Sequence, residues 1–354
     1  MRDVIPEIDQ WIENNEKIAI ATVIHTWGSS PRGIGSKMAL TPGGKITGSV
    51  SMGCVEGAVI EAGLEVLRTG LPQRLHFGVA DELAWHVGLS CGGNIDIFVQ
   101  PINTTIYNSI RSTLETELPV AIATITNSPP DLLGQEILIY EDGQVIGDIK
   151  GSLRAQIVKA SESPLKIGQA QLINLIHENL QTLEVFINVL LPSPQIVIIG
   201  GVHIAIALSK IAQILDYRTT VIDPREVFAN PVRLTGIDRI INKWPDEGLA
   251  QLCINRSTAI VALSHDPKLD DQALMMALNS PAFYVGALGS RRTNAQRRQR
   301  LLEADMTEEQ LERLHAPIGL DISARSPEEI ALSIMAEIVS VYNSNHGQEI
   351  TPVD

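Results

Sequence analysis

Cysteine is scarce in this chain, whose 354 residues include only Cys54, Cys91 and Cys253. Three cysteines do not make a disulfide framework of the kind found in small secreted domains. No pair with the spacing CxxC or HxxxH occurs. We therefore expect no structural zinc site, and we assign no metal ligands.

Long hydrophobic runs and a positive charge balance are missing too. The apolar run at residues 196–201 is far too short to span a bilayer. The N-terminal segment MRDVIPEIDQWIEN is acidic and amphipathic and has no apolar signal core, so we expect a cytoplasmic protein without a membrane contact. The formal net charge of −14 argues against nonspecific nucleic-acid binding, which depends on a basic surface.

The chain does contain enough apolar sequence for large cores, since 44% of its residues are hydrophobic and its length predicts two domains or more. The order of helix and strand patterns predicts an α/β protein in three parts. An N-terminal α+β region holds two copies of one unit, at residues 1–102 and, in degenerate form, at residues 103–190. After the linker LPSPQ, residues 195–345 form a Rossmann-like domain with a doubly wound parallel sheet.

The internal repeat rests on matched order and apolar pattern. In each copy a helix precedes an apolar strand, IAIATVI in the first and VAIATIT in the second. A loop with serine, proline and glycine then leads to a hairpin, KMALT-PGG-KITGSV or EILIY-EDG-QVIGDI, and to another helix. Each copy closes with a strand, NIDIFVQPI or LEVFINVLLP, which a less regular region precedes in the first copy.

The two copies differ in the residues that carry chemistry. Counting from Gly48 and Gly147 at the hairpin ends, Leu153 of the second copy stands where the first copy has Cys54. The second copy also lacks the arginine of SPRG and has no counterpart of LSCGG. Because the fold does not demand these residues, we interpret the first copy as functional and the second as scaffold.

Two candidate sites lie in the first copy. Cys54 and Gly53 occupy a turn of small residues before a helix that runs to about residue 68, and the helix dipole there lowers the pKa of a thiol. The alternative is that Cys54 is a small apolar filler beneath the helix. In SSPRGIGSK, Ser30, Arg32 and Lys37 accompany flexible glycines and form either an anion-binding loop or a plain loop leading into the hairpin.

The C-terminal pattern begins with the strand QIVIIGG, the helix HIAIALSKIAQIL and the strand RTTVID. Gly200 fits the tight turn of a dinucleotide-binding fold, and Asp223 lies where a ribose-binding acid is expected. Val202 replaces the glycine that lets a pyrophosphate approach the backbone, whereas Ala205 suits close helix packing. The signal for NAD(P) is therefore poor, and the alternative is a Rossmann scaffold reused for another ligand or a partner.

Ligands of such sheets bind beyond the carboxyl ends of the strands. The strongest segment there is GALGSRR, whose glycines and two arginines precede a helix and suit a phosphate or another anion. The later arginines of this helix, Arg297, Arg298 and Arg300, are expected to form a solvated basic face. His265 is either a ligand contact or a capping residue. The candidate ligand-binding residues at this edge are Gly200, Gly201, His203, Asp223, Arg225, His265, Asp266, Gly289, Ser290, Arg291 and Arg292.

Six stretches together resemble the XdhC/CoxI family of xanthine dehydrogenase accessory proteins. They are GSSPRGIGSKM, GSVSMGCVEGAVIE, LSCGGNIDIFVQP, SHDPKLDDQAL, YVGALGSRRTNAQRR and PIGLDISARSPEEIALSIMAEIV. The resemblance implies a bacterial maturation factor that binds molybdenum cofactor (molybdopterin) transiently, helps its terminal oxo ligand become sulfido and delivers it to molybdenum hydroxylases such as xanthine dehydrogenase. Residues 103–190 contribute little to the resemblance.

The resemblance also assigns residues. Cys54 falls on the family's glycine–cysteine–valine–glutamate motif and Cys91 on its SCGG motif, which places soft thiols where a soft metal centre is handled. Residues 291–292 fall on its GSRR motif, and residues 265–266 on the histidine–aspartate that follows the fourth strand. Three residues depart from the pattern by standing where a glycine is common: Met52, Val202 and Ser323.

Three functions follow from these observations. The first is a molybdenum cofactor-binding chaperone, an accessory protein rather than a turnover enzyme, with a xanthine dehydrogenase-like client and a cysteine desulfurase as partners. The second is an NAD(P)-dependent oxidoreductase, which Asp223 favours and Val202 opposes. The third is a cofactor-free adaptor between a cysteine desulfurase and its client. A homodimer is expected, because a closed cleft protects a bound cofactor.

Overall fold

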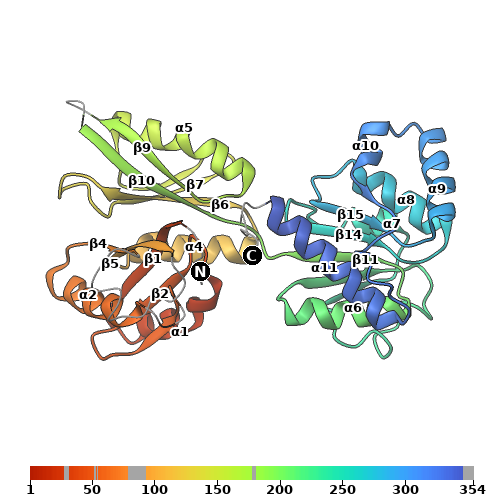
Figure 1. Ribbon diagram of the computed structural model, residues 1–354, viewed down its shortest axis with the longest axis horizontal. Helices are drawn as coiled ribbons and strands as arrows, with labels where there is room; N and C mark the ends of the chain where they lie inside the picture. The colour runs from red at the N-terminus through yellow and green to blue at the C-terminus, as the bar shows by residue number, and fades with distance from the viewer. Residues whose placement is uncertain (28–31, 52, 54, 79–92, 178–180, 346–354) are drawn as a thin grey trace. The chain divides into compact units, whose positions relative to one another are not determined.

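The computed structural model describes residues 1–27, 32–51, 53, 55–78, 93–177 and 181–345, and the chain divides into two compact units (Figure 1). The first unit is Met1–Leu191, and the second begins at Pro192. Both copies of the repeat therefore belong to one compact unit. Within the described ranges, no helix combines the length and the apolar character needed to cross a membrane.

Two five-stranded antiparallel sheets make up the first unit and share one strand order. Sheet A has the order β3-β2-β1-β5-β4, and sheet B has the order β8-β7-β6-β10-β9. The five strands of each sheet are thus arranged in the same way relative to their order along the chain, which confirms the internal repeat. The sequence prediction lacks β4 and β9, because their partly exposed, polar patterns give a weak strand signal. The strands are β1 Ala19–Trp27, β2 Lys37–Leu40, β3 Ile46–Gly48, β4 Gln73–Phe77, β5 Asn94–Pro101, β6 Val120–Asn127, β7 Glu136–Tyr140, β8 Val145–Gly147, β9 Gln171–His177 and β10 Gln181–Leu190.

Each sheet of the first unit is covered by helices on both faces. On one face, α2 packs Val59 and Val66 against sheet A, and α5 packs Ile157 and Leu165 against sheet B. On the opposite faces, α1 packs against sheet A and α4 against sheet B. These helices are η1 Arg2–Val4, α1 Ile5–Glu13, α2 Glu56–Thr69, α4 Thr104–Thr116 and α5 Gly151–Ile167.

The helix register corrects the alignment of the two copies around Cys54. Val55 and Leu153 are both fully or almost fully buried, and each helix ends in a left-handed glycine at the same spacing from them. Leu153 therefore corresponds to Val55 and not to Cys54. The count from Gly48 and Gly147 fails because the turn that leads into α5 is one residue shorter than the turn that leads into α2.

The two copies meet through the sheet faces that α2 and α5 leave uncovered. Ile24 and Phe98 of sheet A join Phe186 of sheet B in one buried apolar cluster. Lys37 and Glu136, the first residues of β2 and β7, occupy equivalent positions in the two sheets. Their opposite charges attract each other across this contact without forming a direct ion pair. The contact between the copies is therefore apolar with a favourable pair of charges beside it.

A six-stranded parallel sheet forms the centre of the second unit, in the order β13-β12-β11-β14-β15-β16. The order runs outward in both directions from β11 and β14, as in a doubly wound Rossmann fold, and confirms the predicted fold class. The edge strands β13 and β16 are missing from the sequence prediction, because strands of two or three residues carry no periodic signal. The strands are β11 Gln195–Ile199, β12 Arg218–Ile222, β13 Arg239–Ile241, β14 Thr258–Ala262, β15 Tyr284–Ala287 and β16 Leu314–His315.

Helices cover both faces of this sheet (Figure 1). On one face α6 and α11 pack together, and Leu208 and Ile334 enter the core there. On the other face α7 and α8 cover the sheet, with Leu301 of α9 and Leu311 of α10 packed into the same core. The helices are α6 His203–Ile214, α7 Pro245–Leu249, α8 Pro267–Leu278, α9 Arg291–Glu303, α10 Glu308–Glu312 and α11 Pro327–Asn345.

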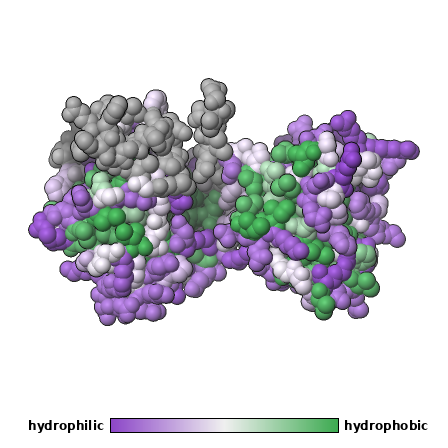
Figure 2. Space-filling view, turned by 60° about the horizontal axis from the view of Figure 1, so that its bottom comes forward, coloured by the Kyte–Doolittle hydropathy of each residue, from purple (hydrophilic) through white to green (hydrophobic). Residues whose placement is uncertain are grey.

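Apolar side chains are exposed at scattered positions of the surface. On the face drawn in Figure 2, hydrophilic residues predominate and apolar ones gather in separate patches. Among the most exposed are Val232, Ile214 and Val227 of the second unit. Exposed apolar residues are normal for a folded protein, and nothing in the described part of the chain indicates what would cover these patches. The homodimer therefore stays a prediction.

Candidate functional site

The strand order of the parallel sheet reverses at the pair β11 and β14, which lie side by side. Ligands of doubly wound sheets bind beyond the carboxyl ends of the strands at such a switch point. The loops after β11, β12, β14 and β15 hold the ligand residues predicted from the sequence. Because the strands are parallel, all four loops leave the sheet at the same edge.

Two glycines allow neighbouring backbone to pack closely against the turn after β11. Gly200 has a φ of +104°, and a Cβ added to it would lie 2.7 Å from the Cα atom of Ser264. A Cβ on Gly201 would lie 2.2 Å from the carbonyl oxygen of Phe228. These glycines therefore let other segments of the chain approach the turn. His203 follows in the first turn of α6, where its side chain is exposed.

Asp223, after β12, does not present a free carboxylate to a ligand. It is fully buried and accepts hydrogen bonds from the backbone N–H of Gly201 at 2.9 Å and from the guanidinium of Arg225 at 2.7 and 2.8 Å. Burial alone would raise the pKa of Asp223, but the hydrogen bonds from Arg225 and Gly201 bring it below its usual value. The Arg225 guanidinium also lies 4.1 Å from the centroid of the Phe228 ring. A ribose would have to displace these partners, so the geometry opposes dinucleotide binding here.

The loop after β14 exposes a histidine and uses its aspartate as a cap. His265 is exposed and has a φ of +61°, which is uncommon for a residue other than glycine. Asp266 accepts a hydrogen bond from the backbone N–H of Lys268 at 3.0 Å and so caps α8. The capping residue of this loop is thus Asp266, and the His265 side chain is left at the surface.

The loop after β15 leads into the start of α9. Ser290 caps this helix, since its Oγ accepts a hydrogen bond from the backbone N–H of Thr293 at 3.1 Å. Arg291 and Arg292 are exposed in the first turn, and their side chains have no hydrogen bond or ion pair with the described part of the chain. Backbone N–H groups at a helix start, together with two guanidiniums, fit a phosphate or another anion.

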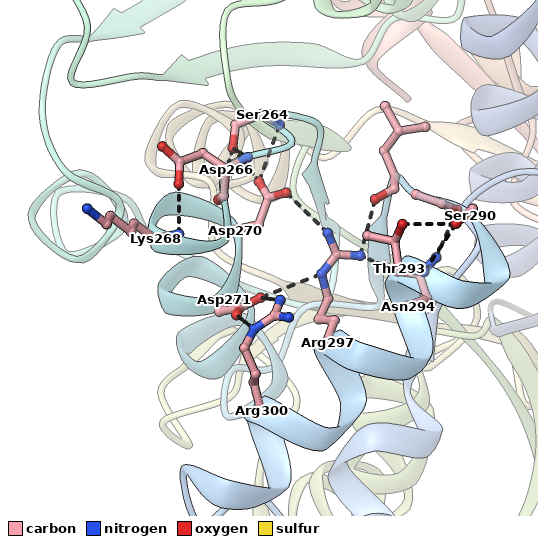
Figure 3. Close-up of polar contacts among 12 residues, drawn as sticks. Ser264, Asp266, Lys268, Asp270, Asp271, Ser290, Thr293, Asn294, Arg297 and Arg300 are labelled. Atoms are coloured by element: carbon pink, nitrogen blue, oxygen red, sulfur yellow. Dashed lines mark hydrogen bonds and ion pairs between the residues drawn. The ribbon is translucent and has the colours of Figure 1, made fainter.

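The predicted solvated basic face of α9 is wrong for Arg297. Its side chain is 3% exposed and forms an ion pair with Asp270 of α8 at 3.2 Å (Figure 3). Arg298 and Arg300 are less buried, and they pair with Glu308 and with Asp271. One usable sign was present in the sequence, because Asp270 falls on the apolar face of α8 and a carboxylate buried there requires a partner.

In the first unit, Arg32 lies against the turn that precedes α2. Its Nε donates a hydrogen bond to the backbone carbonyl of Ser49 at 3.2 Å. The Ser49 hydroxyl donates to the carboxylate of Glu56, in the first turn of α2. The structure thus brings the arginine of the predicted anion loop to the helix start that follows Cys54 in the sequence.

The other predicted residues of this unit divide into two groups. Cys54, Cys91 and Ser30 lie outside the described residues, so their roles stay predictions. Gly53 has a φ of +115°, with open space where a Cβ would stand. Lys37 is buried and donates to the hydroxyl of Thr22 at 2.8 Å, so we leave it out of the ligand-binding set. In the described ranges, no three side chains of His, Cys, Asp or Glu gather to hold a metal ion.

The departures from the family pattern have local structural explanations. Val202 has an ordinary extended backbone with a φ of −85°, and its side chain packs against the core beside α6. Ser323 has a φ of +59°, a left-handed conformation that a glycine adopts without steric strain. Met52 lies outside the described residues. Only Ser323, of the two departures that the structure describes, therefore occupies a backbone conformation that itself favours glycine.

Two family models match the chain. Residues 11–78 match the model described as the XdhC and CoxI family. Residues 196–338 match the model of the XdhC Rossmann domain. The two segments together cover more than half of the chain and contain Arg32, Glu56, His265 and Arg291.

Relatives align over nearly the whole length. The chain is 25% identical over 340 residues to a protein of Bacillus subtilis (strain 168) that is named as a probable subunit of xanthine dehydrogenase, covering 94% of this chain and 95% of that protein. It is 25% identical over 324 residues to the molybdenum cofactor insertion chaperone PaoD of Escherichia coli (strain K12), covering 91% and 82%. A crystal structure of a protein described as a xanthine dehydrogenase from Bacillus halodurans matches with a TM-score of 0.72 over 98% of both chains at 23% identity, and supports the fold.

Proposed function

Because the chain belongs to the XdhC and CoxI family, we propose that it is an accessory protein that binds molybdenum cofactor and supports its insertion into a molybdenum hydroxylase. The names of two relatives support this proposal, one a probable xanthine dehydrogenase subunit and the other a molybdenum cofactor insertion chaperone. In this role the cofactor is cargo, which the protein binds, protects and passes on.

The observation that carries the proposal is the anion site at the start of α9. The cofactor bears a phosphate, and Arg291 and Arg292 project from a helix start whose backbone N–H groups also attract an anion. The exposed His265 follows the neighbouring strand β14 at the same edge of the sheet. We assign these three side chains to the anionic part of the cargo.

We assign the sulfur chemistry to the first unit. Cys54 and Cys91 are the proposed thiols, because thiolates are suitable partners for a soft metal centre. Arg32 adds a cation to the segment that contains Cys54 in the sequence, since it donates to the carbonyl of Ser49 while it also pairs with Asp3 at 3.3 Å. The proposal includes sulfuration of the cofactor, a cysteine desulfurase as sulfur donor and a xanthine dehydrogenase-type client, with transient binding by a cytoplasmic homodimer.

Binding of the cofactor tests the proposal directly. Anaerobic protein is mixed with purified molybdenum cofactor, passed through a desalting column and assayed for retained molybdenum, with NAD as a second ligand. We expect stoichiometric retention by the wild type and binding weaker by about tenfold or more in Arg291→Ala/Arg292→Ala, which loses two charge-assisted contacts.

Arg298→Ala is the matched control, because Arg298 is an exposed arginine on the same helix that pairs with Glu308 instead. We expect it to retain cofactor like the wild type. Retention of NAD in place of molybdenum would make the protein an oxidoreductase, against the contacts that occupy Asp223. Capture of the client without any cofactor retention would make it an adaptor.

The thiol assignment has its own test. Cys54→Ala and Cys91→Ala are expected to abolish production of active client while the protein stays folded. Ser152→Ala is the matched control, because the corrected helix register places Ser152 in the second copy where the first has Cys54. Full client activity with both cysteine variants would leave these thiols without a role in maturation.

A further inference from the structure

A buried ion pair lies next to the two loops of the second unit that hold the proposed ligand residues, at 264–266 and 288–292. Asp270 of α8 is 0% exposed, Arg297 of α9 is 3% exposed, and their charged groups are 3.2 Å apart. Figure 3 shows that the pair bridges the two helices just behind the points where the loops enter them. None of the roles assigned so far uses either residue.

Asp270 holds the loop that follows β14. Its Oδ1 accepts hydrogen bonds from the backbone N–H of Ser264 at 3.2 Å and from the Ser264 hydroxyl at 2.6 Å. Ser264 immediately precedes His265, the exposed histidine with the left-handed backbone. Asp270 therefore holds Ser264, the residue that precedes His265 in the chain.

Arg297 holds the loop that follows β15. Its guanidinium donates to the backbone carbonyl of Leu288 at 3.1 Å and to the side chain of Asn294. Asn294 in turn donates to the carbonyl of Gly289 at 3.0 Å. These contacts fix the two residues that come just before the capping Ser290, and so fix the point at which Arg291 and Arg292 emerge.

The energetics of buried charge favour a positioning role over a purely stabilising one. Apolar residues of similar volume generally stabilise a helix contact as well as a buried ion pair does, because both ions lose their hydration. Burial raises the pKa of Asp270 above its usual value even though Ser264 and Arg297 act to lower it. The contacts that an apolar pair could not reproduce are the hydrogen bonds to the two loops.

We propose that Asp270 and Arg297 are positioning residues that hold the loop at 264–266 and the loop at 288–292 in one fixed arrangement, so that His265, Arg291 and Arg292 address a single anionic ligand. This inference rests on the proposed function for the identity of the ligand. The coupling between the loops is a property of the protein alone and can be measured without ligand.

The same two helices provide a matched control. Arg300 of α9 pairs with Asp271 of α8 at 2.5 and 3.1 Å, one turn further along α9 and one residue further along α8. This pair is partly exposed, and within the described part of the chain Arg300 donates to neither loop. Asp271 also lies 3.6 Å from the Nε atom of Arg297. Arg300→Met therefore removes one of the two arginines that pair with Asp271 and leaves the contacts between Arg297 and the loop in place.

Hydrogen exchange of the full chain without ligand is the first measurement. Arg297→Met is expected to speed exchange by about tenfold or more at both loops. This includes 264–266, to which Arg297 is connected, in the described part of the chain, through Asp270. The amides in the middle of α8 and α9 should stay protected. Arg300→Met should leave both loops as in the wild type. Unchanged exchange at 264–266 in Arg297→Met would overturn the proposal, whether or not the protein binds cofactor.

Cofactor binding supplies the second measurement, in the form of a double-mutant cycle. If Arg297 positions Arg291, then Arg291→Ala weakens binding strongly in the wild-type and Arg300→Met backgrounds but by less than about twofold in the Arg297→Met background. Equal losses in all three backgrounds would contradict the positioning role. Absence of cofactor binding by the wild type would instead refute the proposed function, and the exchange result would still decide the inference.

Two further variants keep the test valid if Arg297→Met does not fold. Arg297→Lys keeps the positive charge but cannot donate to Asp270, Leu288 and Asn294 together, so it should loosen the loop at 288–292 first. Asp270→Asn keeps an acceptor for Ser264 and loses the ion pair, so it should partly uncouple the loops. Wild-type exchange in both folded variants would count against the proposal.

Discussion

The two copies of the first unit share a backbone plan but place opposite charges at one equivalent position. Thr22 faces Lys37 in sheet A, and Thr124 faces Glu136 in the same register of sheet B. Lys37 donates to Thr22 at 2.8 Å, and Glu136 accepts from Thr124 at 3.0 Å. Identical copies would bring like charges together here. The difference in one residue therefore makes the two copies complementary to each other.

A second difference lies where each hairpin leads into its helix. The stretch from Gly48 to Val55 is one residue longer than the stretch from Gly147 to Leu153, although both stretches end in buried side chains of matching helices. The additional residue lies in the segment that contains Cys54. The buried positions of the unit are thus the same in both copies, whereas the turn before the helix differs in length and sequence.

The largest effect is expected when the charge pair between the copies is broken. Lys37→Met removes the cation that attracts the Glu136 carboxyl, which then keeps a less compensated charge or takes up a proton. We expect the free energy of unfolding to fall by about 2 kcal/mol, below the range for breaking a buried ion pair in direct contact. Urea unfolding followed by circular dichroism measures the loss. Lys37→Met/Glu136→Leu should recover most of it, and a double variant as weak as the single one would show that the charges are not complementary.

The next effect concerns the glycines that end the two hairpins. Gly48 and Gly147 have φ values of +74° and +124°, and an added Cβ would lie 2.3 Å and 2.6 Å from the carbonyl oxygens of Lys37 and Glu136. Gly48→Ala and Gly147→Ala should each lower the free energy of unfolding by at least about 1–2 kcal/mol. Thermal unfolding compares them. Only Gly48→Ala should also reduce client maturation. A similar loss of maturation with Gly147→Ala would contradict the interpretation of the first copy as functional and the second as scaffold.

The third effect is the pH dependence that Lys37 produces. Burial lowers its pKa from 10.5 to about 8, against the attraction of Glu136 and Asp3. Between these two values the unfolded chain binds more protons than the folded one, so the free energy of unfolding rises with pH, by up to about 1.4 kcal/mol per pH unit. Urea unfolding from pH 8 to 10 should show this rise in the wild type and in Lys45→Met, whose lysine is exposed. The rise should be missing in Lys37→Met, and an identical slope there would remove Lys37 as its source.

The smallest effect concerns Arg74, a partly exposed cation at the same interface. Arg74 of β4 pairs with Asp96 of its own sheet at 2.5 Å and with Glu184 of sheet B, and its side chain is 31% exposed. Solvent reaches and screens the Arg74 end of these pairs, so Arg74→Met should lower the free energy of unfolding by about 1 kcal/mol. The same urea titration measures it, with salt as a second variable. If Arg74→Met lowered the free energy of unfolding as much as Lys37→Met does, burial would not explain the difference in strength between the two charge interactions.

Much of the fold follows from patterns that are local in the sequence. The similar strands IAIATVI and VAIATIT and the two hairpins predict the repeat. The alternation of strands and helices after Gln195 predicts the parallel sheet. The short edge strands and α10 escape prediction, because a few residues give no period to recognise. The helix register around Leu153 also escapes, because a count along the chain cannot tell which side chains become buried.

The candidate site is predictable only in part, for a related reason. The segment GALGSRR identifies the exposed arginines, since small residues followed by cations before a helix are a local signal. Asp223 and Lys37 carry the right residue type for a ligand contact, but the fold surrounds them with Arg225, Gly201 and Thr22. Arg297 carries the residue type of a solvated face and is buried instead.

The sequence by itself determined where helices and strands form and which turns hold small and basic residues, because burial on one face repeats with the period of each element. Only the tertiary structure decided which charged side chains face a ligand and which face each other. Lys37 and Glu136 are far apart in the chain, and so are Asp270 and Arg297. Each pair comes close enough for its charges to attract only after separate elements pack. A charge buried by that packing must find its partner there, because the water that would otherwise solvate it has been excluded.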